Sequence, residues 1–349
     1  MIIGPSIHDN NIGGIFNHMK MLSKLEIFRN AYFFDVGSIH SKAKQPVYKI
    51  LYNILSLRNE IYKNNISIIL INTSIDLTSI IKLSLILLVL PRKIQIHIYY
   101  HGGNYENITL LKNKLFRRGI NYILRNNAQY YFLYSAQRDS FKKFFNCENT
   151  QLYLNYSDYN NIIEHKSNPI SKLRLLFCGR IVKSKGVYEL LEAFNYLYHH
   201  ETDDILLRFV GVGPDYDRLK NMAQKYNIKG IEFTGYLSGR DLESVYADSD
   251  LTVLPSYREA FPFIMIESFR AGIPMICTPV GALSEYVRDG ITGFKIEKRS
   301  VNSIIHTIRK CINNGDLIDH MSKNCYDLYK SKLTKNRAEV YYSEVINSH

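Results

Sequence analysis

Two glutamates in one short stretch are the residues best placed to do chemistry. Seven residues separate Glu259 from Glu267, and the strand-like run 251–254 precedes them. The pattern predicts a strand, a loop holding Glu259 and a helix holding Glu267. Pro262 would lie in the first helical turn, where its missing N–H costs little. Because ligands bind where parallel strands end and helix N-termini attract anions, we expect a binding site here.

Two cations could complement these carboxylates. The loop GRIVKSKG carries Arg180 and Lys185 between a predicted strand and a predicted helix. Arg offers a planar fork to phosphate oxygens, and Lys offers a mobile point charge. Together they could hold a diphosphate and stabilise one that leaves during a reaction. The alternative is that both residues are ordinary surface cations. Their joint occurrence in the pattern G-R-x4-K-G disfavours this alternative. A glycosidase acid/base pair is not expected, because the partner groups are cations.

Three other loops carry weaker signals. Gly14 ends a Gly-Gly pair at an expected strand-to-helix turn, where backbone could approach a ligand, although a plain turn would look the same. His101 follows a strand, and its position fits a ligand contact and a surface histidine equally well. Asp248 and Asp250 form a D-x-D that could bind a metal. They precede a strand rather than follow it, so no metal is expected there.

The composition is that of a basic globular protein. The 349 residues are 46% hydrophobic and carry a net charge of +12, which suits an acidic partner. No nucleic-acid-binding module is recognisable, so no nucleic acid is expected. Five cysteines without a CxxC pair indicate a reducing compartment. The sequence shows neither a signal-peptide pattern nor about 20 consecutive apolar residues, so a cytoplasmic protein is expected.

Alternating strand and helix patterns predict an α/β protein. The strands lack polar alternation, which indicates parallel sheets covered on both faces. Gly211-Val212-Gly213 lacks the third glycine of a dinucleotide-binding fingerprint, so a dehydrogenase is disfavoured. The predicted strands are 1–5, 31–36, 66–71, 94–100, 130–135, 151–156, 173–178, 205–210, 231–234, 251–254 and 275–278.

One segment of the first half is strongly basic. Residues 109–145 contain eight Lys or Arg against one acid, Asp139, with apolar and aromatic residues between them. This composition fits a surface for anionic lipid, and it equally fits a solvated helix face.

Residues 173–295 resemble the retaining glycosyltransferases of the GT-B fold, in the large family 4 (group 1). The matching segments are GRIVKSKG, GVGP (211–214), FTGYL (233–237), residues 246–294 and the E-x7-E pair. Ala260 stands where the family commonly has glycine. The first half is similar more loosely, through Gly13-Gly14, His101-Gly102, the predicted strand that ends at Ser135, and Leu154-Asn155.

The resemblance implies two Rossmann-like domains facing across a cleft. Residues 1–160 would bind the acceptor, residues 170–332 the nucleotide-sugar, and a final helix, about 333–349, would complete the first domain. Glu259 would face the donor sugar and Glu267 would bond the ribose. The implied catalytic residues are Glu259 and His101, and the implied donor-binding residues are Gly14, Arg180, Lys185, Gly213, Tyr236, Leu237, Phe261, Pro262, Phe263, Ile264 and Glu267.

The activity implied by the resemblance is a retaining, metal-independent hexosyltransferase without a cofactor. The donor would be a UDP-sugar or, second, a GDP-sugar. The acceptor would be a lipid-linked or cell-surface polysaccharide, capsule or lipopolysaccharide precursor at the inner face of the plasma membrane. A nucleotide-sugar epimerase or hydrolase on the same fold, and a non-catalytic partner that keeps the fold, are the alternatives.

Overall fold

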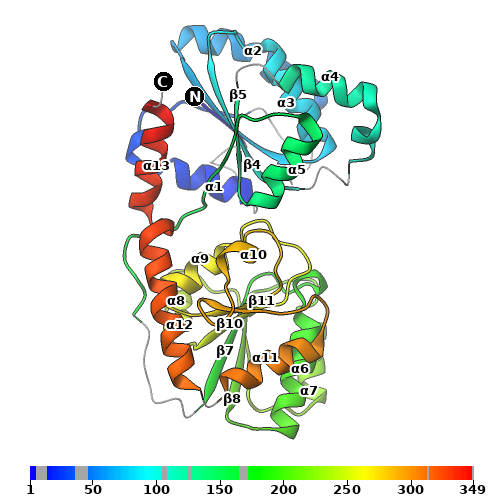
Figure 1. Ribbon diagram of the computed structural model, residues 1–349, viewed down its shortest axis with the longest axis vertical. Coiled ribbons are helices and arrows are strands. Elements are labelled where there is room, and N and C mark those ends of the chain that lie inside the picture. Colours follow the sequence, from blue (N-terminus) through cyan, green and yellow to red (C-terminus); the bar gives the residue numbers. More distant parts are fainter. Residues whose placement is uncertain are drawn as a thin grey trace. The chain divides into compact units, whose positions relative to one another are not determined.

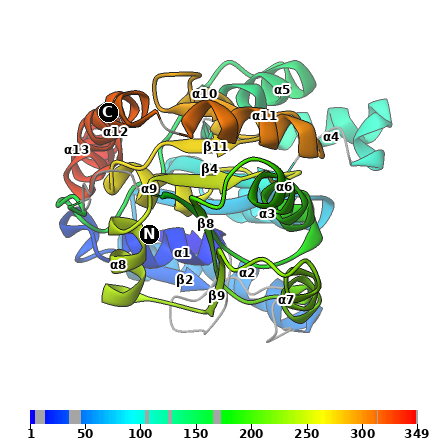
Figure 2. The same ribbon diagram turned by 90° about the horizontal axis from the view of Figure 1, so that it is seen from below.

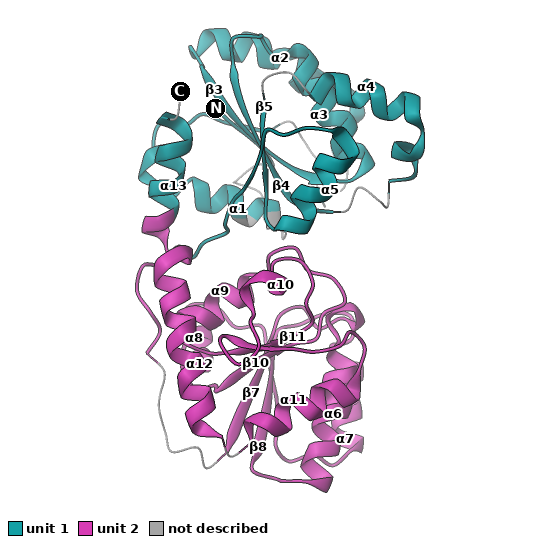
Figure 3. Cartoon of the chain, in the orientation of Figure 1, with its two compact units in different colours: residues 1–158, 338–349 teal, residues 159–337 magenta. Residues whose placement is uncertain are grey.

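The computed structural model divides the chain into two compact units (Figure 3). Unit 1 comprises Met1–Asp158 and Ala338–His349, and unit 2 comprises Tyr159–Arg337. The acceptor and donor roles expected for the two domains stay predictions. The structure describes residues 1–4, 14–35, 46–103, 108–124, 128–164, 172–312 and 314–347.

Unit 1 is built on a parallel six-stranded sheet of order β2-β1-β3-β4-β5-β6. The order turns back between β1 and β3, as in doubly wound folds that bind ligands at the switch point. β3 extends beyond the predicted strand because its pairing with β4 continues through an irregularity near Thr73. The strands are β1 Ile2–Gly4, β2 Phe33–Asp35, β3 Ile68–Ile75, β4 Gln95–Gly103, β5 Ala128–Phe132 and β6 Thr150–Leu152.

Helices cover both faces of this sheet (Figures 1 and 2). Alternate residues of β4 point to opposite faces. Ile98 and Tyr100 join the apolar core under α2 to α5, whereas Tyr99 lies against aromatic rings of α1 and α13. The elements outside the sheet are α1 Gly14–Leu22, η1 Glu26–Phe28, α2 Val47–Lys63, α3 Leu77–Val89, η3 Thr109–Lys112, α4 Lys114–Leu124, α5 Ser135–Phe145 and α13 Lys335–Asn347.

Unit 2 has a second parallel six-stranded sheet, of order β12-β11-β10-β7-β8-β9. Counted from β7, this is the Rossmann order, which turns back between β7 and β10. The strands are β7 Leu173–Cys178, β8 Ile205–Val210, β9 Ile231–Gly235, β10 Leu251–Leu254, β11 Met275–Cys277 and β12 Gly293–Lys295.

Two helix layers enclose this second sheet (Figure 1). Helix α6 packs against α7 and α11 in one layer, and α9 packs against α12 in the other. The elements outside the sheet are η4 Lys183–Lys185, α6 Val187–His200, α7 Tyr216–Lys225, α8 Gly239–Ala247, α9 Phe263–Arg270, α10 Leu283–Tyr286, α11 Val301–Cys311, α12 Gly315–Leu328 and the π-helical η5 Tyr329–Leu333.

The predicted α/β class with two Rossmann-like sheets is confirmed. Several predicted elements of unit 2 coincide with the structure, including β7, β8, β10 and α6. Three local predictions are wrong. β5 ends at Phe132 rather than at residue 135, where α5 already begins, and β6 ends at Leu152 rather than at residue 156. Pro262 is the N-cap of α9 rather than a first-turn residue, with extended backbone at φ −73° and ψ 130°.

Candidate functional site

The predicted donor residues of unit 2 gather in loops at the carboxyl ends of its strands. Lys185 follows β7, Gly213 follows β8, and Tyr236 follows β9. Glu259 follows β10, in the loop that leads to α9. Since parallel strands end at one edge of their sheet, the fold brings these side chains to the edge where α/β sheets bind ligands.

The closest contact among these residues is an ion pair between Lys185 and Glu259. The ammonium of Lys185 donates to Oε1 of Glu259. The Glu259 side chain is 10% exposed and the Lys185 side chain 27% exposed. The pair joins two residues that lie 74 positions apart in the chain. Lys185 is therefore neutralised by a carboxylate here, and an incoming diphosphate would compete for the same ammonium.

Backbone contacts hold the two loops of this ion pair together. The N–H of Tyr257 donates to the carbonyl of Ser184 at 2.8 Å. Gly186 has a φ of +71°, and a Cβ on it would overlap the carbonyl oxygen of Pro255. Glycine is therefore required at 186, both for its left-handed backbone and for the close approach of the two loops.

A third loop supports Glu259 from the side of β11. The N–H of Ala282 donates to the carbonyl of Ala260 at 2.7 Å. Gly281 has a φ of +56°, and a Cβ there would overlap the carbonyl oxygens of Glu259 and Ala260. Gly281 was not among the predicted site residues, although its place in a glycine-containing loop after a strand was a usable signal.

Helix α9 presents its N-terminus beside Glu259. Its cap, Pro262, has no side chain that can accept a hydrogen bond. The Pro262 carbonyl accepts from the N–H of Met265 at 3.1 Å, whereas the N–H groups of Phe263 and Ile264 precede any acceptor within the helix. Phe261 is buried against the ring of Tyr286, at 5.3 Å between centroids. Phe263 and Ile264 open the helix and are half-buried. These N–H groups could bind an anion such as a phosphate.

Glu267 lies one turn before a buried arginine that holds it. Arg270 Nη1 is 3.1 Å from Glu267 Oε2, and its Nη2 is 2.8 Å from Glu243 Oε1. The guanidinium also donates to the carbonyl of Asn161 at 3.1 Å and lies 4.1 Å from the ring centre of Tyr159. Arg270 thus fixes the Glu267 carboxylate, and its role was missed because sequence alone gives no sign of its partners.

The remaining donor residues of unit 2 differ in exposure. Arg180 is exposed and makes no ion pair with the residues that the structure describes. A Cβ on Gly213 would overlap the carbonyl oxygen of Ile181, so the second loop packs directly on the first. The Tyr236 side chain is exposed, and Leu237 packs against an apolar cluster. Arg180 and Tyr236 are thus accessible to a ligand.

Cys178, at the end of β7, is not a nucleophile candidate. Burial raises the pKa of its thiol to about 11, and only a thiolate attacks readily. The thiol is hydrogen-bonded with Tyr246, whose pKa burial also raises. Both groups stay protonated near neutral pH.

His101 and Gly14 belong to unit 1. His101 lies in β4, with Nε2 at 2.8 Å from Oδ1 of Asn72 and Nδ1 at 2.9 Å from the hydroxyl of Tyr153. Both ring nitrogens are therefore bonded to protein groups. Burial holds the pKa of His101 well below its usual value, so the ring is neutral. Gly14 begins α1, and Gly13 lies outside the described residues.

A second histidine, His18 of α1, was missed by the sequence analysis. Its ring lies 4.5 Å from the ring of His101, centre to centre. Its Nε2 is 3.1 Å from the hydroxyl of Tyr342 in α13, and burial lowers its pKa to about 3. The spacing of residues in the sequence could not reveal the contact between His18 and Tyr342, because the two stand at opposite ends of the chain.

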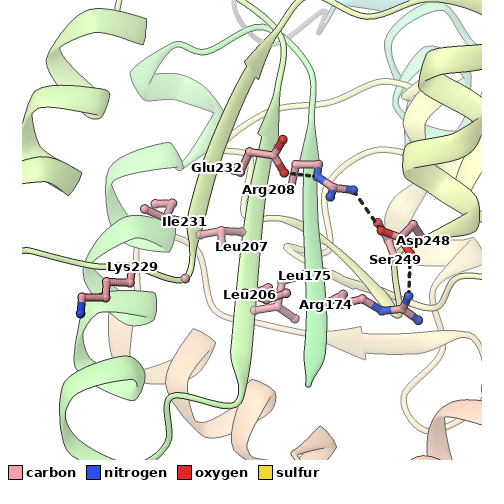
Figure 4. A pocket seen from close by; sticks show the side chains of 11 residues that line it. Arg174, Leu175, Leu206, Leu207, Arg208, Lys229, Ile231, Glu232, Asp248 and Ser249 are labelled. Carbon is pink, nitrogen blue, oxygen red and sulfur yellow. Dashed lines mark hydrogen bonds and ion pairs between the residues drawn. The ribbon is translucent and has the colours of Figure 1, made fainter. Parts of the chain in front are cut away.

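The D-x-D lies at the other end of the unit 2 sheet, where Asp248 lines a pocket at the amino ends of the strands and Asp250 is buried (Figure 4). Arg174 is 2.8 Å from Asp248 and 2.7 Å from Asp250. Arg208 approaches Asp248 at 3.6 Å and bonds Glu232 at 2.6 Å. The aspartates thus take part in a structural network of ion pairs. Metal independence itself stays a prediction.

No helix among the described residues is both long and apolar enough to cross a membrane.

Residues 158–328 match the model of the family described as glycosyl transferases group 1. A relative is the lipopolysaccharide 1,2-N-acetylglucosaminetransferase of Salmonella typhimurium, 30% identical over 42% of this chain and 44% of its own. The chain spans less than half the length of the first curated relatives that it matches.

Two solved structures are similar over nearly the whole chain. A glycosyltransferase from Rickettsia africae has a TM-score of 0.78 at 16% identity, covering 99% of this chain and 97% of its own. Anabaena HepE in complex with UDP has a TM-score of 0.76 at 14% identity, covering 100% and 99%. Over residues 158–328 the chain is thus similar to the glycosyl transferases of group 1, which supports a glycosyltransferase, and over its whole length it has the GT-B fold.

Proposed function

We propose that the protein transfers a sugar from a nucleotide-sugar to a hydroxyl of a glycan acceptor, with retention at the anomeric carbon. The observation that carries the proposal is the ion pair between Lys185 and Glu259, set at the strand ends beside the free N-terminus of α9. A cation, a carboxylate and the N–H groups of Phe263 and Ile264 at one edge suit a ligand that has both a diphosphate and a sugar.

Donor binding would exchange the partner of Lys185. The diphosphate, with its larger negative charge, takes the ammonium from Glu259, and Arg180 adds a second cation. Glu259 is then released to face the sugar, where it stabilises positive charge as the leaving group departs. Glu267, held by Arg270, accepts hydrogen bonds from the ribose hydroxyls.

The bond changes of the proposed step balance without a cofactor. The bond from the anomeric carbon to the diphosphate oxygen breaks, and the acceptor hydroxyl oxygen bonds to the same carbon from the same face. The acceptor's proton passes to an oxygen of the leaving phosphate. The cations and the N-terminus of α9 stabilise the charge on that phosphate, so we propose a metal-independent reaction. The engagement of Asp248 and Asp250 by arginines supports this.

A relative's complex supports a UDP-sugar as donor, and a GDP-sugar is the second candidate. HepE is described in complex with UDP, and the Salmonella relative acts on lipopolysaccharide by its name. We therefore propose a lipid-linked or cell-surface polysaccharide precursor as acceptor.

The proposal is tested with Glu259→Gln and the matched control Glu192→Gln, an exposed residue of α6. Losing the charge that stabilises the sugar should lower kcat at least about 100-fold. A UDP-sugar should still raise the melting temperature of Glu259→Gln, because the contacts to the nucleotide remain. Transfer is measured on a glycan acceptor after screening UDP- and GDP-sugars by melting temperature.

Full activity of Glu259→Gln would contradict the assigned role. Incubating the wild type with donor alone separates the alternatives, since sugar conversion without acceptor would indicate an epimerase or a hydrolase. A melting temperature that no nucleotide-sugar raises would indicate a non-catalytic protein.

A further inference from the structure

Helix α2 is apolar on two opposite sides. Its inner side is buried in the core of unit 1 and consists of Ile50, Ile54, Leu57 and Ile61. Its outer side exposes Tyr48, Leu51, Tyr52, Leu55 and Tyr62. Four of these outer residues are between 63% and 75% exposed. Residues three, four and seven apart share one helix face, so they form a continuous stripe that packing within unit 1 does not explain.

The two neighbouring helices extend this stripe into a broad surface. Helix α3 packs against both α2 and α4 (Figure 1). It exposes Ile81 and Leu88. Helix α4 exposes Leu115 and Tyr122, at 76% and 81%. We call the exposed side chains of α2, α3, η3 and α4 the outer surface.

The outer surface is rimmed by cations. Its exposed Lys and Arg residues include Lys49, Arg58, Lys63, Lys112, Lys114 and Arg118. The described acids between residues 46 and 124 are Glu60 and Asp76. Glu60 bonds to Tyr32 and Asn64, and Asp76 caps α3 by accepting from Ser79. Both acids are only partly exposed, so the cations dominate the charge of this surface.

We infer that the outer surface binds an anionic lipid bilayer, with α2 lying in the interface. Tyr and Leu side chains suit the boundary between headgroups and acyl chains, and flanking Lys and Arg reach the phosphates. A second copy of the chain is the poorer occupant. A two-fold interface would press the same cationic rim against itself, and lysine is depleted in protein interfaces.

This placement differs from the one that composition suggested. In the segment 109–145, α5 buries Phe141 and Phe145, and β5 belongs to the sheet. Among the described residues of that segment, the exposed large apolar side chains are Leu110 of η3 and Leu115 and Tyr122 of α4. Helix α2 lies outside the segment and supplies the larger apolar stripe. The inference goes beyond the transfer reaction and is tested without donor or acceptor.

The absence of tryptophan from the sequence provides a direct test on the full chain. Tyr52→Trp places a single reporter on α2, and Tyr196→Trp places a control on α6, which belongs to unit 2. With phosphatidylcholine vesicles containing about 30% phosphatidylglycerol, the emission of the α2 reporter should shift to shorter wavelength. The control should not shift. With vesicles of pure phosphatidylcholine, the emission of both reporters should shift less than that of the α2 reporter with anionic vesicles.

Vesicle sedimentation then separates the apolar and the electrostatic contributions. The combined variant Lys112→Ser, Lys114→Ser and Arg118→Ser should bind anionic vesicles about 100-fold less tightly, from about fivefold per cation. Tyr48→Ser with Leu55→Ser should also weaken binding. Lys220→Ser with Lys225→Ser, on exposed positions of α7, should not. Melting temperatures confirm that each variant folds.

Three results would overturn the inference. The first is wild-type protein that does not sediment with anionic vesicles. The second is vesicle binding by the α2 and α4 variants that equals the binding of the wild type. The third is a stable dimer of the wild type that the variant Tyr48→Ser with Leu55→Ser dissociates. Because transfer to a soluble acceptor is assayed separately, failure of lipid binding is distinguishable from failure of the proposed reaction.

Discussion

At the scale of single residues, charge pairing decides what each site side chain can do. Glu259 and Glu267 are both carboxylates, but each faces a different cation. Lys185 is partly exposed, so a diphosphate can compete for it, whereas the Arg270 side chain is 2% exposed and has two carboxylate partners. The Glu259 pair is therefore exchangeable and the Glu267 pair is structural.

Replacing Arg270 should destabilise unit 2 and disturb Glu267. Arg270→Met removes the buried cation that bonds Glu243 and Glu267, which should cost about 3 kcal/mol in free energy of unfolding. If donor binding uses Glu267, KM for the donor should rise more than kcat falls. The control Arg309→Met removes an exposed pair with Glu201 and should cost much less stability, because solvent screens such a pair. Equal losses in chemical denaturation would contradict the structural role of Arg270.

At the scale of elements, the site consists of loops that fit against one another. The loop after β7 contacts the loop after β10 through Ser184 and Tyr257, and the loop after β11 supports Ala260. Gly186 and Gly281 make these approaches possible. The position of Glu259 therefore depends on three connections between strands and helices, rather than on its own loop alone.

Gly186→Ala should uncouple these loops. The new Cβ would overlap the Pro255 carbonyl, so the backbone must shift and the contact between Lys185 and Glu259 should weaken. Gly290→Ala is the matched control, because Gly290 also has a left-handed φ, of +69°, but has no atom near its added Cβ. Both variants should lose about 1 kcal/mol for the left-handed backbone.

Only Gly186→Ala should lose additional stability, which denaturation measures. It should also bind UDP much more weakly, which calorimetry measures. Identical behaviour of the two alanine variants would show that the loop contact does not matter.

At the scale of the whole molecule, residues far apart in sequence meet inside unit 1. Tyr342 of α13 bonds His18 of α1, and the ring of His18 lies 4.5 Å from the ring of His101 of β4, centre to centre. In addition, Glu339 of α13 accepts a hydrogen bond from the N–H of Glu26 at 2.6 Å. The C-terminal helix thus contributes to the surroundings of a predicted catalytic histidine.

These buried histidines should make the stability depend on pH. Burial lowers the pKa of His18 to about 3, whereas the unfolded chain would titrate near 6.5. Between these values the unfolded state binds more protons, so stability is full above pH 6.5 and is lost as the pH falls. His101 acts in the same direction. Each histidine should contribute about 1.4 kcal/mol per pH unit well below pH 6.5.

The free energy of unfolding, measured by denaturation between pH 7 and pH 5, reports this dependence. In this pH range Asp76, the carboxyl group with a strongly lowered pKa, does not titrate. Hydrogen bonds from serine and threonine side chains outweigh burial and lower the pKa of Asp76 to about 2, so Asp76 acts at lower pH. His18→Gln should reduce the slope by about half. Tyr342→Phe keeps the titrating ring and should keep the slope. Equal slopes in wild type and His18→Gln would refute the assignment.

The sequence by itself determined the elements and the loops that carry the chemistry. Continuous apolar runs such as β7, β8 and β10 predict buried parallel strands, and glycines next to Arg180 and Lys185 mark the strand ends. Local pattern suffices there because backbone pairing and burial depend on neighbouring residues. The resemblance added candidate roles for Glu259 and Glu267, which the proposed variants will test.

Only the tertiary structure decided which side chains meet. Lys185 with Glu259, Arg270 with Asn161 and His18 with Tyr342 are contacts across long stretches of chain. It also showed that α2 is apolar outward as well as inward. Periodicity shows that a helix can bury a face, but which faces find a partner depends on how the remaining elements pack around the sheet.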